Sequence, residues 1–276
     1  MAKHVFAYSM WRTGSTALAR CFLENNAYLV FYEPFHELIR SEGRIRAESK
    51  KQLERTTKLS HPVWRGGYFD TYLRVDPLTG QTLSKLFDRS ASVRTVYSDA
   101  PQQGALNYLD ACRRVAEVEG KRAFFGFCRS GTQLKGIPLH DGEEAFYLRR
   151  EVDTQMRSFG WPKNKYFIPQ SFAQLAVSPN FSSNVQNVKG ILPRSYCRLI
   201  KKFPRLGDAA WVSRRVVRNI SVMEANSIFA TAHSATASAA KSVGLETYTI
   251  SELATHAKES FEKKFSVDIS LLHPLD

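Results

Sequence analysis

Residues 4–22 constrain the fold of this chain more than any other segment. An apolar run at 5–8 leads into the turn Arg12-Thr13-Gly14-Ser15-Thr16, and a helix-forming run, 17–23, follows directly. This order predicts a strand, a tight turn and a helix. Such a turn directs backbone N–H groups and the positive end of a helix dipole toward one point, which makes an anion-binding site.

The side chains of the turn agree with an anion site. Gly14 lets a ligand approach the backbone closely. Thr13, Ser15 and Thr16 add hydroxyl donors, and Arg12 adds a planar cation suited to phosphate or sulfate. The alternative is a surface turn in which a serine or threonine merely caps the helix.

The turn departs from the GxxxxGK(S/T) signature of nucleotide triphosphatases, whose lysine reaches the β- and γ-phosphates. Ser9 stands where the first glycine would be, and Ser15 rather than lysine follows Gly14. The sequence therefore disfavours ATP or GTP hydrolysis. It favours a nucleotide with fewer phosphates, or a different leaving group.

Predicted strands and helices alternate along the chain. Further strands are predicted at 28–32, 122–128, 144–148 and 245–250, and helices at 104–119, 224–242 and from Ser251 onward, with Gly120 and Gly244 as stop signals. We therefore predict an α/β fold, with a mostly parallel doubly wound sheet, a P-loop-like strand–loop–helix and helical insertions. A length of 276 residues suits a single domain, 1–276, with ligands at the carboxyl ends of the strands.

Composition narrows the location and the metal chemistry. No apolar stretch has the length of a signal peptide or of a membrane helix, so we expect a cytoplasmic protein without stable membrane insertion. Because the four cysteines lack metal-ligand spacing, each is expected to be a buried apolar residue, and no metal is predicted. They are Cys21, Cys112, Cys128 and Cys197.

The charge balance favours an anionic partner. The formal net charge is +13, from 39 basic and 26 acidic residues. No recognised nucleic-acid-binding motif accompanies this charge, so we predict no nucleic-acid partner. The densest basic run, 194–218, is either a solvated face or the entry for an anionic ligand.

A second candidate anion site lies near the middle of the chain. Arg150 lies at the end of the strand predicted at 144–148, and Ser158 follows Arg150 by eight residues. An arginine and a hydroxyl so placed hold one phosphate from two sides. Arg149 stands beside Arg150, so which of the two arginines binds the phosphate is open.

Together, RTGST at 12–16 and the Arg150/Ser158 pair resemble the sulfotransferases that use 3′-phosphoadenosine 5′-phosphosulfate (PAPS), in their bacterial and Golgi-type branch. That family carries (K/R)-(S/T)-G-(S/T)-(S/T) for the 5′-phosphosulfate. It also carries a strand-ending arginine, with a serine eight residues later, for the 3′-phosphate. The chain departs from this branch at Glu151-Val152, where a residue and then proline are usual.

The resemblance covers about residues 1–40 and 120–160 and implies roles for three more residues. Glu33, which lies 21 residues after Arg12, is implied as the base, with His36 as its rival. Arg129, at the end of the third strand, is implied to complete the sulfuryl site. The implied reaction moves a sulfuryl group from PAPS, as co-substrate and without a metal, to a hydroxyl of a carbohydrate or other small-molecule acceptor.

The range 37–120 is expected to be a helical and loop insertion that shapes the acceptor pocket. Its aromatic residues and those just before it either line that pocket or belong to the core: Tyr32, Phe35, Trp64, Tyr68, Phe69 and Tyr72. Two other functions stay open. One is a P-loop small-molecule kinase or phosphotransferase, and the other is a non-catalytic polyanion-binding protein. No pattern in the sequence predicts an oligomeric state.

Overall fold

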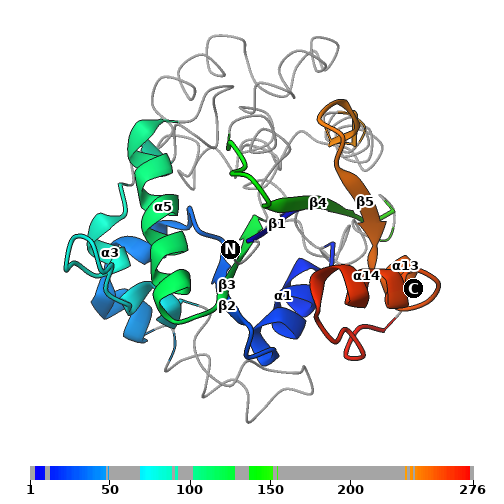
Figure 1. Cartoon of the computed structure of the whole chain (residues 1–276), viewed down its shortest axis with the longest axis horizontal. Helices are drawn as coiled ribbons and strands as arrows, with labels where there is room; N and C mark the ends of the chain where they lie inside the picture. Colours follow the sequence, from blue (N-terminus) through cyan, green and yellow to red (C-terminus); the bar gives the residue numbers. More distant parts are fainter. Residues whose placement is uncertain are drawn as a thin grey trace, which may run out of the picture.

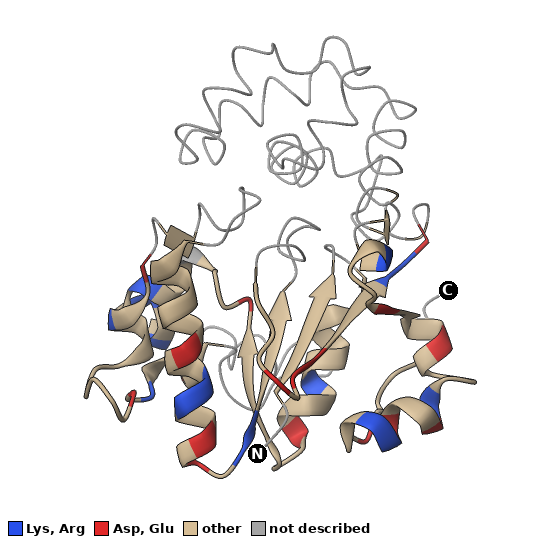
Figure 2. Cartoon of the chain, turned by 45° about the horizontal axis from the view of Figure 1, so that its top comes forward, with Lys and Arg blue, Asp and Glu red and all other residues tan. Residues whose placement is uncertain are grey.

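The computed structural model describes residues 4–9, 13–47, 49, 69–88, 91–92, 102–127, 137–151, 154, 234, 237–238 and 240–273. Within these residues, five strands form one parallel sheet in the order β2-β3-β1-β4-β5 (Figures 1 and 2). The strands are β1 Val5–Ser9, β2 Tyr28–Tyr32, β3 Arg122–Phe127, β4 Glu144–Arg149 and β5 Glu246–Thr249. The predicted α/β fold with a parallel sheet is confirmed.

The first two strands along the chain, β1 and β2, are buried on both faces. Every residue of β1 and of β2 is buried, which explains why both read as continuous apolar runs rather than as alternating ones. Along β1, Phe6 and Tyr8 belong to one core, while Val5 and Ala7 belong to the other. Successive side chains therefore enter opposite layers.

Helix α5 (Gln103–Val118) covers the first face, together with the short elements η2 (Asp70–Leu73) and α3 (Leu83–Leu86). Stacked rings fill this layer, with 4.6 Å between the ring centroids of Phe6 and Phe125. Helices α1 (Ser15–Glu24), α13 (Ile250–Leu253) and α14 (Lys258–Phe265) cover the second face (Figure 1).

The strand order reverses at β1. The chain passes from β1 to the outer strand β2, returns through α5 to β3, and then continues to β4 and β5 beyond the other side of β1. In sheets of this kind, ligands bind at the carboxyl ends of the strands next to such a reversal. Here the carboxyl end of β1 leads into the loop before α1, the predicted anion site.

Among the described residues, the predicted elements are found with small shifts, while most of the helix predicted at 224–242 lies outside them. The stop at Gly120 is confirmed by a φ of 67°, and the stop at Gly244 by a φ of 73°. The prediction that Ser251 opens the last helix is wrong. The helix α13 begins at Ile250, because the side chain of Thr249 caps it and Glu252 completes a reciprocal capping box.

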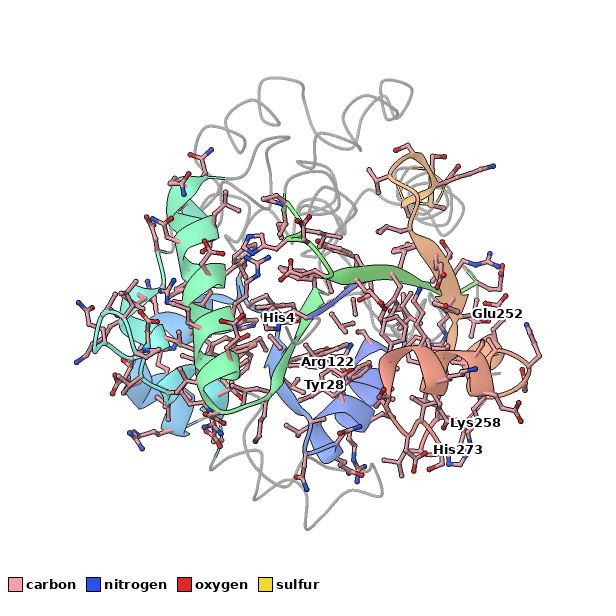
Figure 3. All side chains as sticks on the ribbon, viewed as in Figure 1. His4, Tyr28, Arg122, Glu252, Lys258 and His273 are labelled. Carbon is pink, nitrogen blue, oxygen red and sulfur yellow. The ribbon has the colours of Figure 1, made fainter. Side chains whose placement is uncertain are left out.

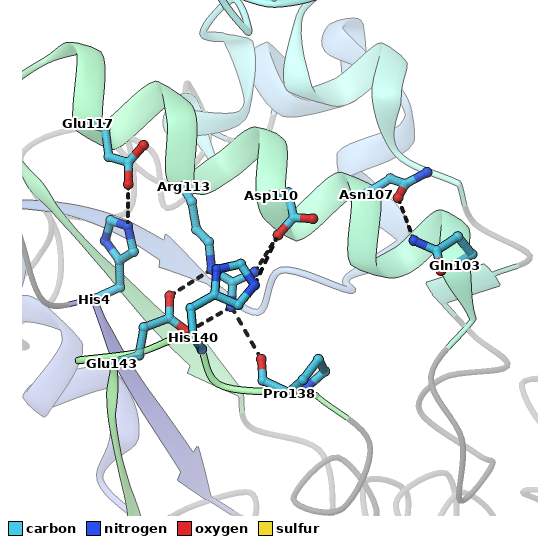
Figure 4. A network of polar contacts seen from close by, with 9 residues as sticks. All are labelled: His4, Gln103, Asn107, Asp110, Arg113, Glu117, Pro138, His140 and Glu143. Carbon is cyan, nitrogen blue, oxygen red and sulfur yellow. Dashed lines mark hydrogen bonds and ion pairs between the residues drawn. The ribbon is translucent and has the colours of Figure 1, made fainter. Parts of the chain in front are cut away.

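A polar network ties the amino ends of β1 and β4 to α5 (Figure 4). The Arg113 guanidinium, nearly buried, donates to both carboxylate oxygens of Glu143, at 2.7 and 2.9 Å, and to Asp110 at 2.6 Å. His4 accepts a hydrogen bond from the Ala123 N–H at 2.9 Å. These contacts lie at the opposite end of the strands from the loop before α1.

A second set of contacts joins the first residues of β2 and β3 to the end of α14 (Figure 3). Arg122 lies over the Tyr28 ring, 4.7 Å from its centroid, and donates to the Phe265 carbonyl at 3.0 Å. The Tyr28 hydroxyl donates to the same carbonyl, and burial raises the pKa of Tyr28 to about 12. Tyr28 is therefore a neutral structural donor.

Candidate functional site

Thr13 and Gly14 are the described part of the loop between β1 and α1, and Gly14 has the backbone form that the sequence predicts. Gly14 adopts a left-handed conformation, with φ 90°, which glycine takes without strain, and its carbonyl accepts the first helical bond from the Leu18 N–H at 3.1 Å. Gly14 is itself the N-cap, with no side-chain capping bond, so the alternative of a Ser- or Thr-capped turn is wrong.

The N-terminus of α1 suits a negative ligand. The first amides of a helix have no partner within the helix, and they carry its partial positive charge. The first turn of α1 contains no acidic side chain that would offset this charge. Thr13 is fully buried, and Ser9, at the end of β1, donates to the Phe127 carbonyl at 3.0 Å. Arg12 lies outside the described residues.

A hydrogen bond joins the first turn of α1 to the end of β2. The Thr16 hydroxyl, in the first turn of α1, lies 2.7 Å from the Tyr32 hydroxyl. The Tyr32 ring crosses Gly126 of β3 so closely that a Cβ added there would lie 3.1 Å from Tyr32 Cδ2. Glycine at 126 therefore makes room for the ring that reaches Thr16.

The sequence predicted Tyr32 as an aromatic residue of the core or of the acceptor pocket, and it did not predict the hydrogen bond to Thr16. The isolated glycine in the strand RAFFGF was a signal of close approach that could have indicated it. The core reading is confirmed for Phe35, Phe69 and Tyr72, which are nearly or fully buried. Trp64 and Tyr68 lie outside the described residues.

Glu33 follows Tyr32 in a strained backbone conformation. Its φ of 48° lies in the left-handed region, which non-glycine residues seldom adopt. The Glu33 N–H donates to the Gly126 carbonyl at 2.8 Å, and the Glu33 carbonyl accepts from the His36 N–H at 2.8 Å. The backbone thus makes a sharp turn at the carboxyl end of β2, and the bond from the His36 N–H to the Glu33 carbonyl closes it.

The same turn brings together the two candidate bases. Glu33 Oε2 lies 3.6 Å from His36 Nε2, and the two side chains are 19% and 30% exposed, respectively. Each is therefore partly shielded but open to solvent or ligand. The other nitrogen of the ring, His36 Nδ1, accepts from the Leu38 N–H at 3.0 Å and caps η1 (Glu37–Arg40).

The second predicted anion site is described in part. Arg149 is the last residue of β4, and its guanidinium lies 3.9 Å from Glu151 and 3.9 Å from Glu252. Arg150 follows directly after the strand and is partly buried. Ser158 lies outside the described residues, as do Arg129 and the basic run 194–218.

Two of the four cysteines lie among the described residues. Cys21 and Cys112 are buried free thiols, and burial raises the pKa of Cys21 to about 12. Cys128 and Cys197 lie outside the described part of the chain. No described helix is long and apolar enough to cross a membrane.

Fold and site together define a parallel α/β protein, with a helix N-terminus at the strand reversal and a carboxylate at the end of β2. No family model and no curated protein matches the sequence. Among solved structures, the chain is similar to sulfotransferase STF9 from Mycobacterium avium, at 12% identity, over 97% of this chain and 78% of that one. The TM-score is 0.35, and a likeness of that size carries no argument about function.

Proposed function

We propose that this chain transfers a sulfuryl group from PAPS to the hydroxyl of a carbohydrate or other small-molecule acceptor. The observation that carries the proposal is the hydrogen bond of 2.7 Å between Tyr32 and Thr16. This bond fastens the end of β2, where the Glu33 carboxylate follows, to the first turn of α1, next to the predicted anion-binding loop. A positioned proton acceptor and an anion site are what transfer of an anionic group to a hydroxyl needs.

The donor supplies an electrophilic sulfuryl group on a phosphate leaving group. In the proposal, Arg12 and the amides of residues 13–16 bind its 5′ end, where the uncompensated N-terminus of α1 favours negative charge. Arg150 and Ser158 bind its 3′-phosphate. Arg149 is the alternative to Arg150 in that role, and its guanidinium lies 3.9 Å from Glu151 and 3.9 Å from Glu252.

Glu33 accepts the proton of the acceptor hydroxyl as that oxygen attacks sulfur, roughly in line with the leaving oxygen. Arg12 and Arg129 offset the negative charge that is spread over the transferring group. Arginines thus provide the positive charge in this proposal, without a metal. Arg12→Ala should therefore slow transfer by about 10²- to 10³-fold, the cost of one lost preorganised donor.

Equilibrium titration distinguishes the proposal from its alternatives. A sulfotransferase should bind adenosine 3′,5′-bisphosphate without magnesium, and far more tightly than ATP. A small-molecule kinase should prefer magnesium-ATP. A polyanion-binding protein should bind heparin with a steep salt dependence and should bind neither nucleotide. Either of the last two results would overturn the proposal.

The acceptor is identified by transfer of radiolabelled sulfate from PAPS to panels of sugars, phenols and sterols. The range 37–120 is proposed to shape the acceptor pocket. In its described part, α5 packs on the sheet as the crossover between β2 and β3. Labelling of an acceptor by the wild-type chain, and not by Arg12→Ala, is the expected outcome.

A further inference from the structure

Several contacts hold His36 in place. Its backbone N–H donates to the Glu33 carbonyl at 2.8 Å, and its Nδ1 accepts from the Leu38 N–H at 3.0 Å. Its ring packs beside Phe69, with 5.1 Å between the centroids. Phe69 is nearly buried, so the imidazole has a firm apolar wall on one side.

The contact with Leu38 decides which nitrogen of the neutral ring carries the hydrogen. A backbone N–H is a donor only, so Nδ1 must offer its lone pair, and the hydrogen therefore lies on Nε2. Nε2 is the nitrogen that faces Glu33 Oε2, at 3.6 Å. A small rotation of the carboxylate, or a bridging water, turns this approach into a hydrogen bond.

This arrangement leaves His36 poorly suited to be the base. Nδ1 is engaged by Leu38, and Nε2 already holds a hydrogen. Protonating Nδ1 would set two donors against each other and break the cap of η1. Of the two candidate bases, Glu33 therefore has the available lone pairs.

We propose that His36 is a positioning residue for Glu33. Its Nε2–H holds one carboxylate oxygen and thereby orients the other toward the acceptor hydroxyl. The left-handed backbone of Glu33 contributes to the same end, because it brings residue 36 back against residue 33. This assignment rests on the proposed sulfuryl transfer and deepens it.

Two substitutions separate the two functions of the ring. His36→Asn keeps an acceptor near the position of Nδ1 and is a favourable N-cap, but it removes the donor at Nε2. His36→Gln keeps an N–H donor near the position of Nε2 and loses the short capping acceptor. His256→Asn, at an exposed histidine of the 255–257 turn, is the matched control.

With saturating PAPS and an identified acceptor, His36→Asn should lower kcat about tenfold to a hundredfold, part of the roughly 10²–10⁴ that a positioned proton acceptor supplies. Its Kd for adenosine 3′,5′-bisphosphate should not change. His36→Gln should recover most of kcat, although its thermal unfolding temperature falls. His256→Asn should match the wild type in kcat, in the Kd for the bisphosphate and in the thermal unfolding temperature.

Nitrogen-15 NMR of the wild type gives a readout that does not depend on activity. The expected spectrum of His36 at neutral pH is that of a neutral ring with hydrogen on Nε2. A ring with hydrogen on Nδ1 would overturn the assignment, and so would full activity of His36→Asn or equal losses in both variants. A wild-type chain that binds no bisphosphate and transfers no sulfate would overturn the proposed function, and this assignment with it.

Discussion

Glu33 combines a chemical group with an unfavourable backbone. A left-handed φ of 48° costs a non-glycine residue of order 1 kcal/mol or more, and such strain is found where surrounding contacts enforce it. Here the enforcing contacts are the bonds of Glu33 to Gly126 and to His36. Glycine would fit this turn without strain, but it would bring no carboxylate. The residue is explained by its side chain and not by its conformation.

Glu33→Gln tests that explanation directly. The amide keeps the shape of the side chain and one acceptor oxygen but cannot take up the proton of the acceptor hydroxyl. We expect kcat to fall by at least about 10²-fold, with the Kd for adenosine 3′,5′-bisphosphate unchanged. Steady-state transfer assays and calorimetric titration measure the two quantities. An unchanged kcat would move the base away from Glu33.

At the scale of elements, β2, β3 and α1 meet through Tyr32. Its ring lies over Gly126, and its hydroxyl reaches Thr16. The contact with Thr16 therefore depends on the absence of a side chain at Gly126. The ends of β2 and β3 and the start of α1 are thereby held in fixed positions relative to one another. Positioning of reacting groups depends on such links, because small displacements are costly to the rate.

Tyr32→Phe removes the hydroxyl and leaves the ring in place. Thr16 then loses a partner in a partly buried site, which costs about 1 kcal/mol. We expect bisphosphate binding to weaken several-fold and kcat to fall by a similar factor. Tyr248→Phe is the control, because that hydroxyl bonds to Glu246 on the edge strand β5. Equal effects of the two substitutions would contradict a role for the Tyr32 link.

Gly126→Ala places a methyl group where the Tyr32 ring passes. The added Cβ would lie 3.1 Å from Tyr32 Cδ2 and 3.3 Å from Phe124 Cε1, closer than ordinary packing allows. We expect a loss of about 1–3 kcal/mol in the free energy of unfolding, measured by urea denaturation. Gly43→Ala, whose Cβ would meet only Ser41 Oγ at 4.0 Å, should show no loss. Unchanged stability of Gly126→Ala would contradict the close approach.

At the scale of the whole molecule, the two ends of the sheet have different tasks. The carboxyl ends bear the candidate site, and the amino ends carry structural polar contacts centred on Arg113 and His4 (Figure 4). Burial lowers the pKa of His4, so the ring is neutral near pH 7. With Nδ1 accepting from Ala123, the hydrogen lies on Nε2, which lies 3.3 Å from Glu117.

This lowered pKa makes stability depend on pH. An unfolded histidine takes up a proton near pH 6.5, whereas His4 in the folded chain takes it up only at lower pH. The contribution of His4 is therefore complete above pH 6.5 and is lost as the pH falls below it. His4→Asn retains an acceptor for Ala123 and does not titrate. Urea unfolding at pH 7.5 and 5.5 should show a smaller pH effect in that variant, and an equal effect would contradict the role of His4.

The sequence predicted the strands well, because each central strand is a buried apolar run that no amphipathic helix would show. It also located Gly14 and Gly244 correctly, since both need a positive φ. It misplaced the start of α13, because Ser251 and Thr249 are both good N-caps and only the capping box decides between them. The Tyr32–Thr16 contact depends on tertiary packing, which no local pattern encodes. The roles of Arg12, Arg129, Arg150 and Ser158 stay predictions.

The position of β1 at the centre of the sheet has a consequence for synthesis. Val5 pairs with Phe124 on one side and with Glu144 on the other, so β1 is made well before either of the strands with which it pairs. In a nascent chain that ends before about residue 150, β1 cannot complete its pairing with β4. The apolar strand β1 therefore stays partly unpaired. Ribosome-bound chains halted before β4 should therefore engage chaperones, and those halted well beyond it should release them.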